Sequence, residues 1–226
     1  MNLIQDWPLI AEGPAPLDDL PAPRWKHNWS THPESARRLF RLVCLLKPRL
    51  IVETGTFEAL GTFALAKAAA QNGLPARIFT VDFDGDPLFD CPHEDWAALK
   101  TWRSENLQKA RSAFPGVEIH FIEGDSREKL PDLLQAVGDP WDLFFQDSMH
   151  FTAGIQAEWE IMKPHASSQA VVVFDDVCLD WKKLPSHLLG RSDFCLSFVL
   201  GDALWGRWRW KSTAQGRAQF FAQRVG

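Results

Sequence analysis

The sequence predicts an α/β protein with a Rossmann-like sheet of five parallel strands, a C-terminal antiparallel hairpin, and helices on both faces. Five apolar runs each end on acidic or small polar residues, at 49–54, 77–82, 117–122, 141–147 and 169–175. Stretches with helical character separate these runs, and strands that alternate with helices imply βαβ crossovers and a parallel sheet. The runs are continuously apolar rather than alternating, as expected for strands that helices cover on both faces.

The chain of 226 residues suits one large domain, residues 31–226, preceded by an N-terminal extension, residues 1–30. The extension is rich in Pro and Trp, and its five prolines oppose regular structure. The first helix is expected to begin near Thr31, because Thr31–His–Pro–Glu34 has the form of a capping box. The same helix is expected to end before Pro48.

The remaining elements follow from spacing and breakers. Helices are expected at 62–71, 94–113, 127–137 and 153–163. Near the C-terminus, 194–200 and 205–211 are apolar or aromatic and are separated by a short connection. Two strands joined in this way must be antiparallel, so we expect them to form the closing hairpin.

Composition excludes several classes of function. A net charge of −5 and a pI near 5.8 disfavour nucleic acid or an anionic membrane as the main partner. No apolar run approaches the length of roughly 18 residues that a membrane span needs, and the first residues do not resemble a signal peptide. The four cysteines are widely spaced without a CxxC pair, which favours a reducing, cytoplasmic compartment.

Carboxylates gather where the predicted strands end. In an open parallel sheet, ligands bind at the carboxyl ends of the strands, near the point where the strand order reverses. Six acidic residues are expected along this edge: Glu53, Asp82, Asp125, Asp147, Asp175 and Asp176. They suit a cation, an amine or ribose hydroxyls, and they would repel phosphates.

The loop after the first strand also argues against a dinucleotide. It runs from Gly55 to Gly61 without the GxGxxG pattern, and Glu58 in its middle would oppose a pyrophosphate. S-adenosylmethionine carries an ammonium, a sulfonium and a ribose, which match the acidic edge. Its one carboxylate could be bound by backbone N–H groups near Gly61 and Thr62, at the start of a helix.

These motifs, in this order, resemble the class I S-adenosylmethionine-dependent methyltransferases. Glu53–Thr–Gly55 and Gly61–Thr62 resemble the family's first motif, Asp82 occupies the place of the ribose-binding acid, and Gly124–Asp125–Ser126 resembles the segment that lines the adenine. The terminal hairpin is also typical of the family. The resemblance implies cofactor contacts from Glu53, Gly55, Gly61, Thr62, Asp82, Asp125, Ser126 and Asp147.

Within that family, the sequence is most similar to small-molecule O-methyltransferases. Asp147–Ser–Met–His150 resembles their Asp-x-x-His segment, and Asp175–Asp176 resembles their Asp-Asp or Asp-Asn segment. The subgroup of catechol and macrolide-sugar enzymes binds Mg²⁺ there, which implies Asp147, Asp175 and Asp176 as metal ligands. Three carboxylates at the ends of neighbouring strands would repel one another unless they are protonated or bridged by a cation.

The resemblance implies methyl transfer to a hydroxyl of a small molecule, with His150 and Asp147 as catalytic residues. The metal would hold the acceptor oxygen, and His150, with an ordinary pKa near 6.5, is the candidate base. The sequence departs from the family's pattern at Ala59, Gln146, Met149 and Ser167–Ser168. Two alternatives stay open: a methyltransferase-like protein that binds the cofactor without catalysis, and a nicotinamide-dependent oxidoreductase. The sequence leaves the oligomeric state open.

Overall fold

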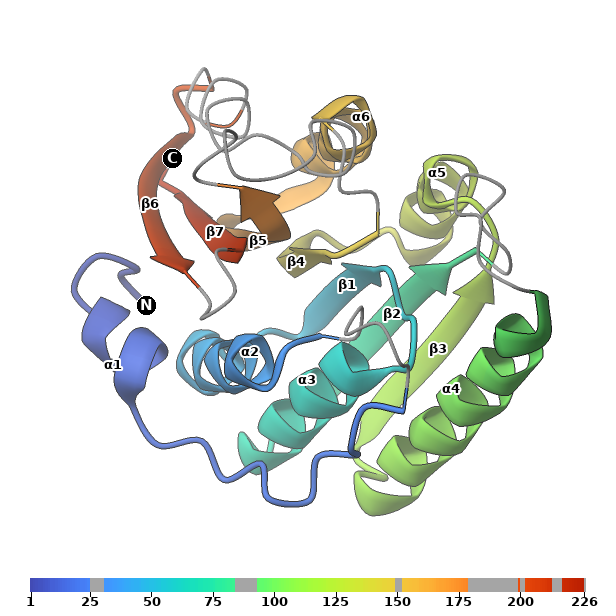
Figure 1. The fold of residues 1–226 in the computed structure, drawn as a ribbon. Coiled ribbons are helices and arrows are strands. Elements are labelled where there is room, and N and C mark those ends of the chain that lie inside the picture. The colour runs from blue at the N-terminus through green and yellow to red at the C-terminus, as the bar shows by residue number, and fades with distance from the viewer. Residues whose placement is uncertain are drawn as a thin grey trace.

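The computed structural model describes residues 1–24, 31–83, 93–148, 152–178, 199, 202–212 and 217–225. It contains one seven-stranded sheet with the order β3-β2-β1-β4-β5-β7-β6 (Figure 1). The strands are β1 (Leu50–Thr54), β2 (Ala76–Asp82), β3 (Val117–Glu123), β4 (Trp141–Gln146), β5 (Ala166–Cys178), β6 (Trp205–Ser212) and β7 (Arg217–Arg224). β1 to β5 pair in parallel, whereas β7 is antiparallel to both β5 and β6. The predicted fold class, five parallel strands with a C-terminal hairpin, is therefore confirmed.

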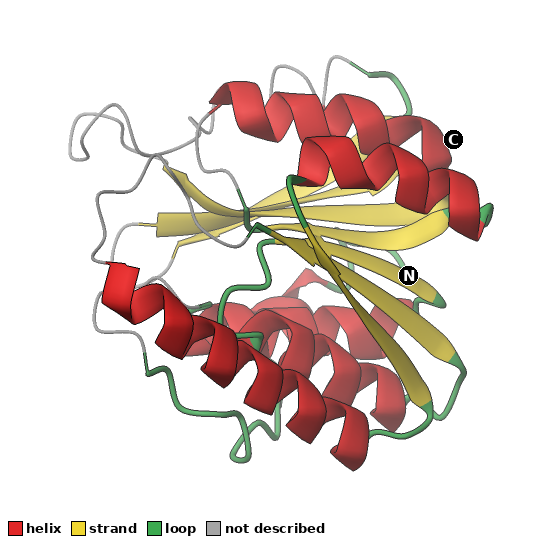
Figure 2. Ribbon diagram, turned by 90° about the vertical axis from the view of Figure 1, so that its right-hand side faces the viewer, coloured by secondary structure: helices red, strands yellow, loops and turns green. Residues whose placement is uncertain are grey.

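Helices cover both faces of the sheet, as Figure 2 shows. They are α1 (Trp7–Glu12), α2 (Pro33–Leu46), α3 (Leu60–Gln71), α4 (His93–Ala113), α5 (Ser126–Val137) and α6 (Thr152–Met162), followed by a 3-10 turn, η1 (Lys163–His165). α2, α3 and α4 pack on one face, and α5 and α6 on the other. Each face has its own apolar core. Within β1, Ile51 belongs to the first core, whereas Leu50 and Val52 belong to the second, because successive strand side chains alternate between faces.

The N-terminal segment is more ordered than its prolines predict. Residues Trp7–Glu12 form α1, with Pro8 in the first turn, where proline costs no helix hydrogen bond. The Trp7 ring lies edge-on to Phe221 of β7, with ring centroids 5.2 Å apart. Leu3 and Ile10 are fully buried in the core beneath α2 and α3. Residues 1–24 thus pack on the α/β core, while Trp25 and Trp29 lie outside the described residues.

The C-terminal hairpin consists of β6 and β7, whereas the sequence predicts strands at 194–200 and 205–211. β6 matches the predicted strand 205–211, but its partner is β7, which lies between β5 and β6. Most of the expected strand 194–200 lies outside the described residues, and Val199 is helical. The sequence obscures β7 because Gln219 and Gln223, both fully buried or nearly so, interrupt its apolar pattern.

The start of α2 also differs from the prediction. The N-cap is His32, whose Nδ1 accepts a hydrogen bond of 3.2 Å from the backbone N–H of Glu34. Thr31 is not the cap, and its hydroxyl instead donates to Asp147 at the sheet edge, at 3.3 Å. The helix ends before Pro48, as expected, with Lys47 in a left-handed conformation. No helix of the described chain combines the length and the apolar character that crossing a membrane requires.

Candidate active site

The loops that follow β1 and β4 meet at the carboxyl edge of the sheet, where the strand order reverses. The backbone N–H of Gly55 donates to the Val81 carbonyl at 2.9 Å, and that of Asp147 donates to the Thr54 carbonyl at 2.8 Å. Gly55 has a φ of +87°, and a Cβ there would lie 2.1 Å from the carbonyl oxygen of Asp147. Glycine is therefore required for both conformation and space.

Glu53 lies beneath the first turn of α3. It is 1% exposed, and its carboxylate accepts a hydrogen bond from the Thr62 hydroxyl. A Cβ on Gly61 would lie 2.5 Å from Oε1 of Glu53, so the glycine is what allows the carboxylate this close to the helix start. Burial raises the pKa of Glu53 to about 7; hydrogen bonds from Thr62 and Thr80 oppose that rise. Three of the predicted cofactor residues, Glu53, Gly61 and Thr62, therefore pack directly against one another.

Asp82, the predicted ribose-binding residue, is held by two backbone groups and a cation. It accepts hydrogen bonds from the N–H groups of Phe57 at 2.7 Å and Phe83 at 2.8 Å. The Arg103 guanidinium lies 3.0 Å from the same carboxylate and 4.6 Å from the centroid of the Phe121 ring. Burial raises the pKa of Asp82, while Arg103 and the two backbone hydrogen bonds lower it. Arg103 was not predicted as part of the site.

Asp125 and Ser126 are at the start of α5, after β3. Asp125 is the N-cap and accepts a hydrogen bond of 2.9 Å from the backbone N–H of Arg127. Its hydrogen bonds from the Arg127 side chain are the main cause of a lowered pKa. Ser126 is 5% exposed, and its hydroxyl points inward to the carboxylate of Glu158.

Glu158 on α6 is a residue that the sequence analysis missed. It is fully buried, and it accepts hydrogen bonds from the hydroxyls of Thr54 at 3.0 Å, Ser148 at 2.6 Å, and Ser126. Burial is the main cause of its raised pKa. The sequence does hold a signal for it. Ile155, Glu158, Trp159 and Met162 share one helix face, and all four are buried, so the acid interrupts an apolar stripe.

Asp147 directly follows β4, and Asp175 lies within β5, one position after Phe174, which pairs with Gln146. Burial is the main cause of the raised pKa of both carboxyls. The pKa of Asp147 lies well above its usual range because Asp175, Asp176 and Glu53 add to the effect, while the Thr31 hydroxyl opposes it. The pKa of Asp175 is about 7, and Asp176 is the neighbour that raises it most. The edge of the sheet therefore gathers carboxyl groups whose pKa values are raised.

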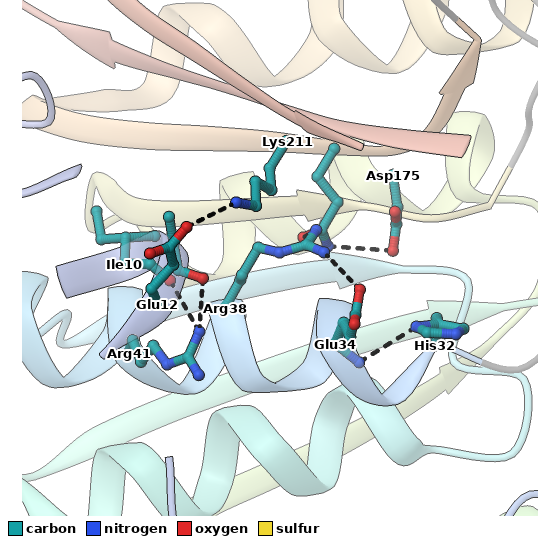
Figure 3. A network of polar contacts seen from close by, with 10 residues as sticks. Ile10, Glu12, His32, Glu34, Arg38, Arg41, Asp175 and Lys211 are labelled. Carbon is teal, nitrogen blue, oxygen red and sulfur yellow. Dashed lines mark hydrogen bonds and ion pairs between the residues drawn. The ribbon is translucent and has the colours of Figure 1, made fainter. Parts of the chain in front are cut away.

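The predicted metal ligands do not form a metal-binding group as they lie. In the described part of the chain, no three His, Cys, Asp or Glu side chains are arranged to hold a metal ion. Asp175 instead accepts hydrogen bonds from the Asp176 N–H at 2.9 Å and from the Gln219 amide at 3.2 Å. The side-chain oxygen Oε1 of Gln219 in turn accepts a hydrogen bond of 2.9 Å from the buried guanidinium of Arg38. The same guanidinium also contacts Glu34 (Figure 3). A network that reaches α2 and β7 thus engages Asp175.

Comparison with known proteins identifies the family. A family model described as a methyltransferase domain matches residues 52–177, more than half of the chain. The chain belongs to this methyltransferase domain family. No curated protein sequence matches it significantly.

Solved structures share the fold of this methyltransferase domain at low sequence identity. The O-methyltransferase TomG of Streptomyces achromogenes, in complex with S-adenosylmethionine, has a TM-score of 0.65 and 20% identity over 88% of this chain and 83% of its own. An O-methyltransferase from Bacillus cereus, in complex with S-adenosylhomocysteine, has a TM-score of 0.64 and 16% identity over 99% and 90% of the two chains. A protein described as a putative O-methyltransferase from Klebsiella pneumoniae has a TM-score of 0.65 and 15% identity over 100% and 97%.

Two departures of this methyltransferase domain from the family's pattern have structural outcomes. Ala59, where glycine is usual, takes a left-handed conformation with a φ of +62° and immediately precedes α3. The backbone has thus kept a shape that glycine adopts more easily. Gln146 is fully buried, and its amide donates to the Ser148 hydroxyl at 3.4 Å. Met149 and the candidate base His150 lie outside the described residues.

Proposed function

We propose that this chain is an S-adenosylmethionine-dependent methyltransferase that acts on a hydroxyl of a small molecule. The family match over residues 52–177 carries the proposal, because it spans β1 to β5 and the glycine loop. The O-methyltransferase neighbours support a hydroxyl acceptor. An acidic edge with small residues at the start of α3 supports a cationic donor that carries a ribose.

The residues of the edge fit the donor in parts. Gly55 and Gly61 let the loop between β1 and α3 pack closely on Asp147 and Glu53, because a Cβ at either position would lie 2.5 Å or less from one of those residues. Asp82, oriented by Arg103 and two backbone N–H groups, is proposed to accept hydrogen bonds from the ribose hydroxyls. Asp125 is proposed to line the adenine side, with the following residue, Ser126.

Bound S-adenosylmethionine supplies a methyl group on a positively charged sulfur. An acceptor oxygen forms the new bond to the methyl carbon while the bond from that carbon to sulfur breaks. The chain's task is to align the two reactants and to receive the proton that the hydroxyl loses. Asp147, at the end of β4, and His150 are the proposed proton acceptors. Thr31, which donates to Asp147, is proposed to orient that carboxylate.

The proposal assigns no step to a metal ion. The three carboxylates that the resemblance implies as ligands do not form a binding group here, and Asp175 is engaged by Gln219. Burial and the neighbouring Asp176 raise the pKa of Asp175 to about 7.

Calorimetric titration with S-adenosylhomocysteine tests the donor site, and transfer of a labelled methyl group to a panel of small hydroxyl compounds tests the reaction. We expect binding and turnover, with both strongly reduced in Asp82→Asn. Binding without turnover on any hydroxyl compound would favour a non-catalytic cofactor-binding protein. Thermal stabilisation by NADH rather than by S-adenosylhomocysteine would favour an oxidoreductase.

A further inference from the structure

Glu158 joins three segments that are far apart in the sequence. It is on α6, and its carboxylate contacts the end of β1, the start of α5 and the residues after β4. The Thr54 hydroxyl, at the end of β1, donates to Oε2 at 3.0 Å. The hydroxyls of Ser126, at the start of α5, and Ser148, after β4, both donate to Oε1. One oxygen therefore holds the segments that follow β3 and β4 against each other.

The two serines directly follow acidic residues of the candidate site. Ser126 follows Asp125, and Ser148 follows Asp147. The Ser148 segment also packs on the glycine loop, since a Cβ on Gly55 would lie 2.7 Å from the Ser148 nitrogen. A displacement at Glu158 would therefore reach the loops after β1, β3 and β4 together.

A carboxylate also fixes the direction of these hydrogen bonds. In the structure the hydroxyls of Thr54, Ser126 and Ser148 donate and the Glu158 carboxylate accepts from all three. A buried acceptor that loses its donors costs more free energy than one ordinary hydrogen bond contributes. The arrangement thus holds two loop backbones in one position rather than merely filling space.

We infer that Glu158 is a positioning residue for the adenosine end of the donor site, acting through Ser126 and Ser148. The inference rests on the proposed function, which places the adenosine beside Asp82 and Asp125. Glu158 itself is fully buried and is not proposed to touch the ligand.

The test is Glu158→Gln in the full chain. This variant keeps the size of the side chain but replaces one accepting oxygen with an NH₂ group, which only donates. Calorimetry with S-adenosylhomocysteine should give binding about tenfold weaker than that of the unmodified protein. Methylthioadenosine, which has the adenosine but no amino-acid portion, should lose affinity by the same factor. Ser148→Ala should weaken binding less, and the double variant should lose less than the product of the two single effects, because both changes remove one shared interaction.

The matched control is Gln223→Leu. Gln223 is 1% exposed and hydrogen-bonds the backbone of Leu3 and Met1, so its loss also removes buried hydrogen bonds, but in β7 beside the N-terminal segment. We expect a lower melting temperature with affinity within twofold of the unmodified protein.

Two results would overturn the inference. One is a folded Glu158→Gln variant whose affinity for both ligands stays within twofold. The other is a loss seen with S-adenosylhomocysteine but not with methylthioadenosine, which would place the effect away from the adenosine. Should Glu158→Gln fail to fold, Ser148→Ala alone decides, with about threefold weaker binding expected and an unchanged affinity contradicting the role. If the unmodified protein binds neither ligand, the proposed function itself is wrong.

Discussion

The guanidinium of Arg103 lies 3.0 Å from the carboxylate of Asp82, and the two residues connect α4 to the end of β2. Arg103 is 4% exposed and Asp82 19% exposed at their side chains. We predict that Arg103→Met lowers the free energy of unfolding by about 2–3 kcal/mol, because it leaves a partly buried carboxylate without its cation. Urea denaturation measures this loss, and calorimetry with S-adenosylhomocysteine should show weaker binding as Asp82 loses its orientation.

Glu105 provides the control on the same helix. It pairs with Arg24, and both side chains are about half exposed, so Glu105→Gln should change stability by less than about 1 kcal/mol and leave cofactor affinity unchanged. Equal losses in the two variants would mean that the Asp82 ion pair has no special role.

The second prediction concerns pH. The folded-state pKa of Glu53 is raised from 4.5 to about 7, so between these values the folded protein holds a proton that the unfolded chain releases. The free energy of unfolding should therefore fall as pH rises from about 4.5 to 7, by on the order of 3 kcal/mol for this one group. Asp175, whose pKa is also raised to about 7, contributes with the same sign.

Glu53→Gln should reduce this slope without abolishing it, because Asp175 remains. Denaturation curves at several pH values measure it, with Glu118→Gln, an exposed position on β3, as the variant that keeps the original slope. An unchanged slope in Glu53→Gln would contradict the assignment.

Third, Gly61→Ala should weaken S-adenosylhomocysteine binding more than tenfold and cost about 1–3 kcal/mol of stability. The added Cβ would lie 2.5 Å from the Glu53 carboxylate and 3.0 Å from the Phe145 ring, both of which are buried. Gly116→Ala is the control, since nothing lies within 4 Å of a Cβ there. Calorimetry compares the affinities of the two variants and thermal melts compare their stabilities. Equal affinity and stability in the two variants would contradict close packing at Gly61.

Fourth, methyl transfer should proceed at an unchanged initial rate when a chelator such as EDTA is added. The physical reason is the engagement of Asp175 by Gln219 and of Gln219 by Arg38, which leaves no group of three ligands in the described residues. A rate that falls with EDTA and recovers with added Mg²⁺ would show that a cation rearranges these carboxylates.

The positions of the acids at the sheet edge could be predicted from the sequence. An apolar run that ends on an acid, repeated along a parallel sheet, places each acid at the same edge. The backbone bonds from Gly55 to Val81 and from Asp147 to Thr54 show that the strand ends indeed meet. The five parallel strands and helices α2 to α6 followed from the same alternation of apolar runs and helical stretches, whereas α1 and β7 did not.

The partners of these acids could not be read with the same ease. Arg38, Arg103 and Glu158 lie on helices, where a charged residue is usually taken as solvent-facing, yet all three are buried. Each interrupts an apolar helix face, and that spacing is the available signal. The predicted capping box at Thr31 failed for a related reason: a tertiary contact with Asp147 took the hydroxyl that a local pattern assigned to the helix.

The contacts of β7 with the N-terminal segment also have a consequence for folding during synthesis. The amide side chain of Gln223 binds the backbone of Met1 and Leu3, and β7 lies between β5 and β6. The contact between the rings of Trp7 and Phe221 can therefore form only after nearly the whole chain has left the ribosome. Until then, the apolar surface of Trp7 has no partner in β7 and is available to molecular chaperones.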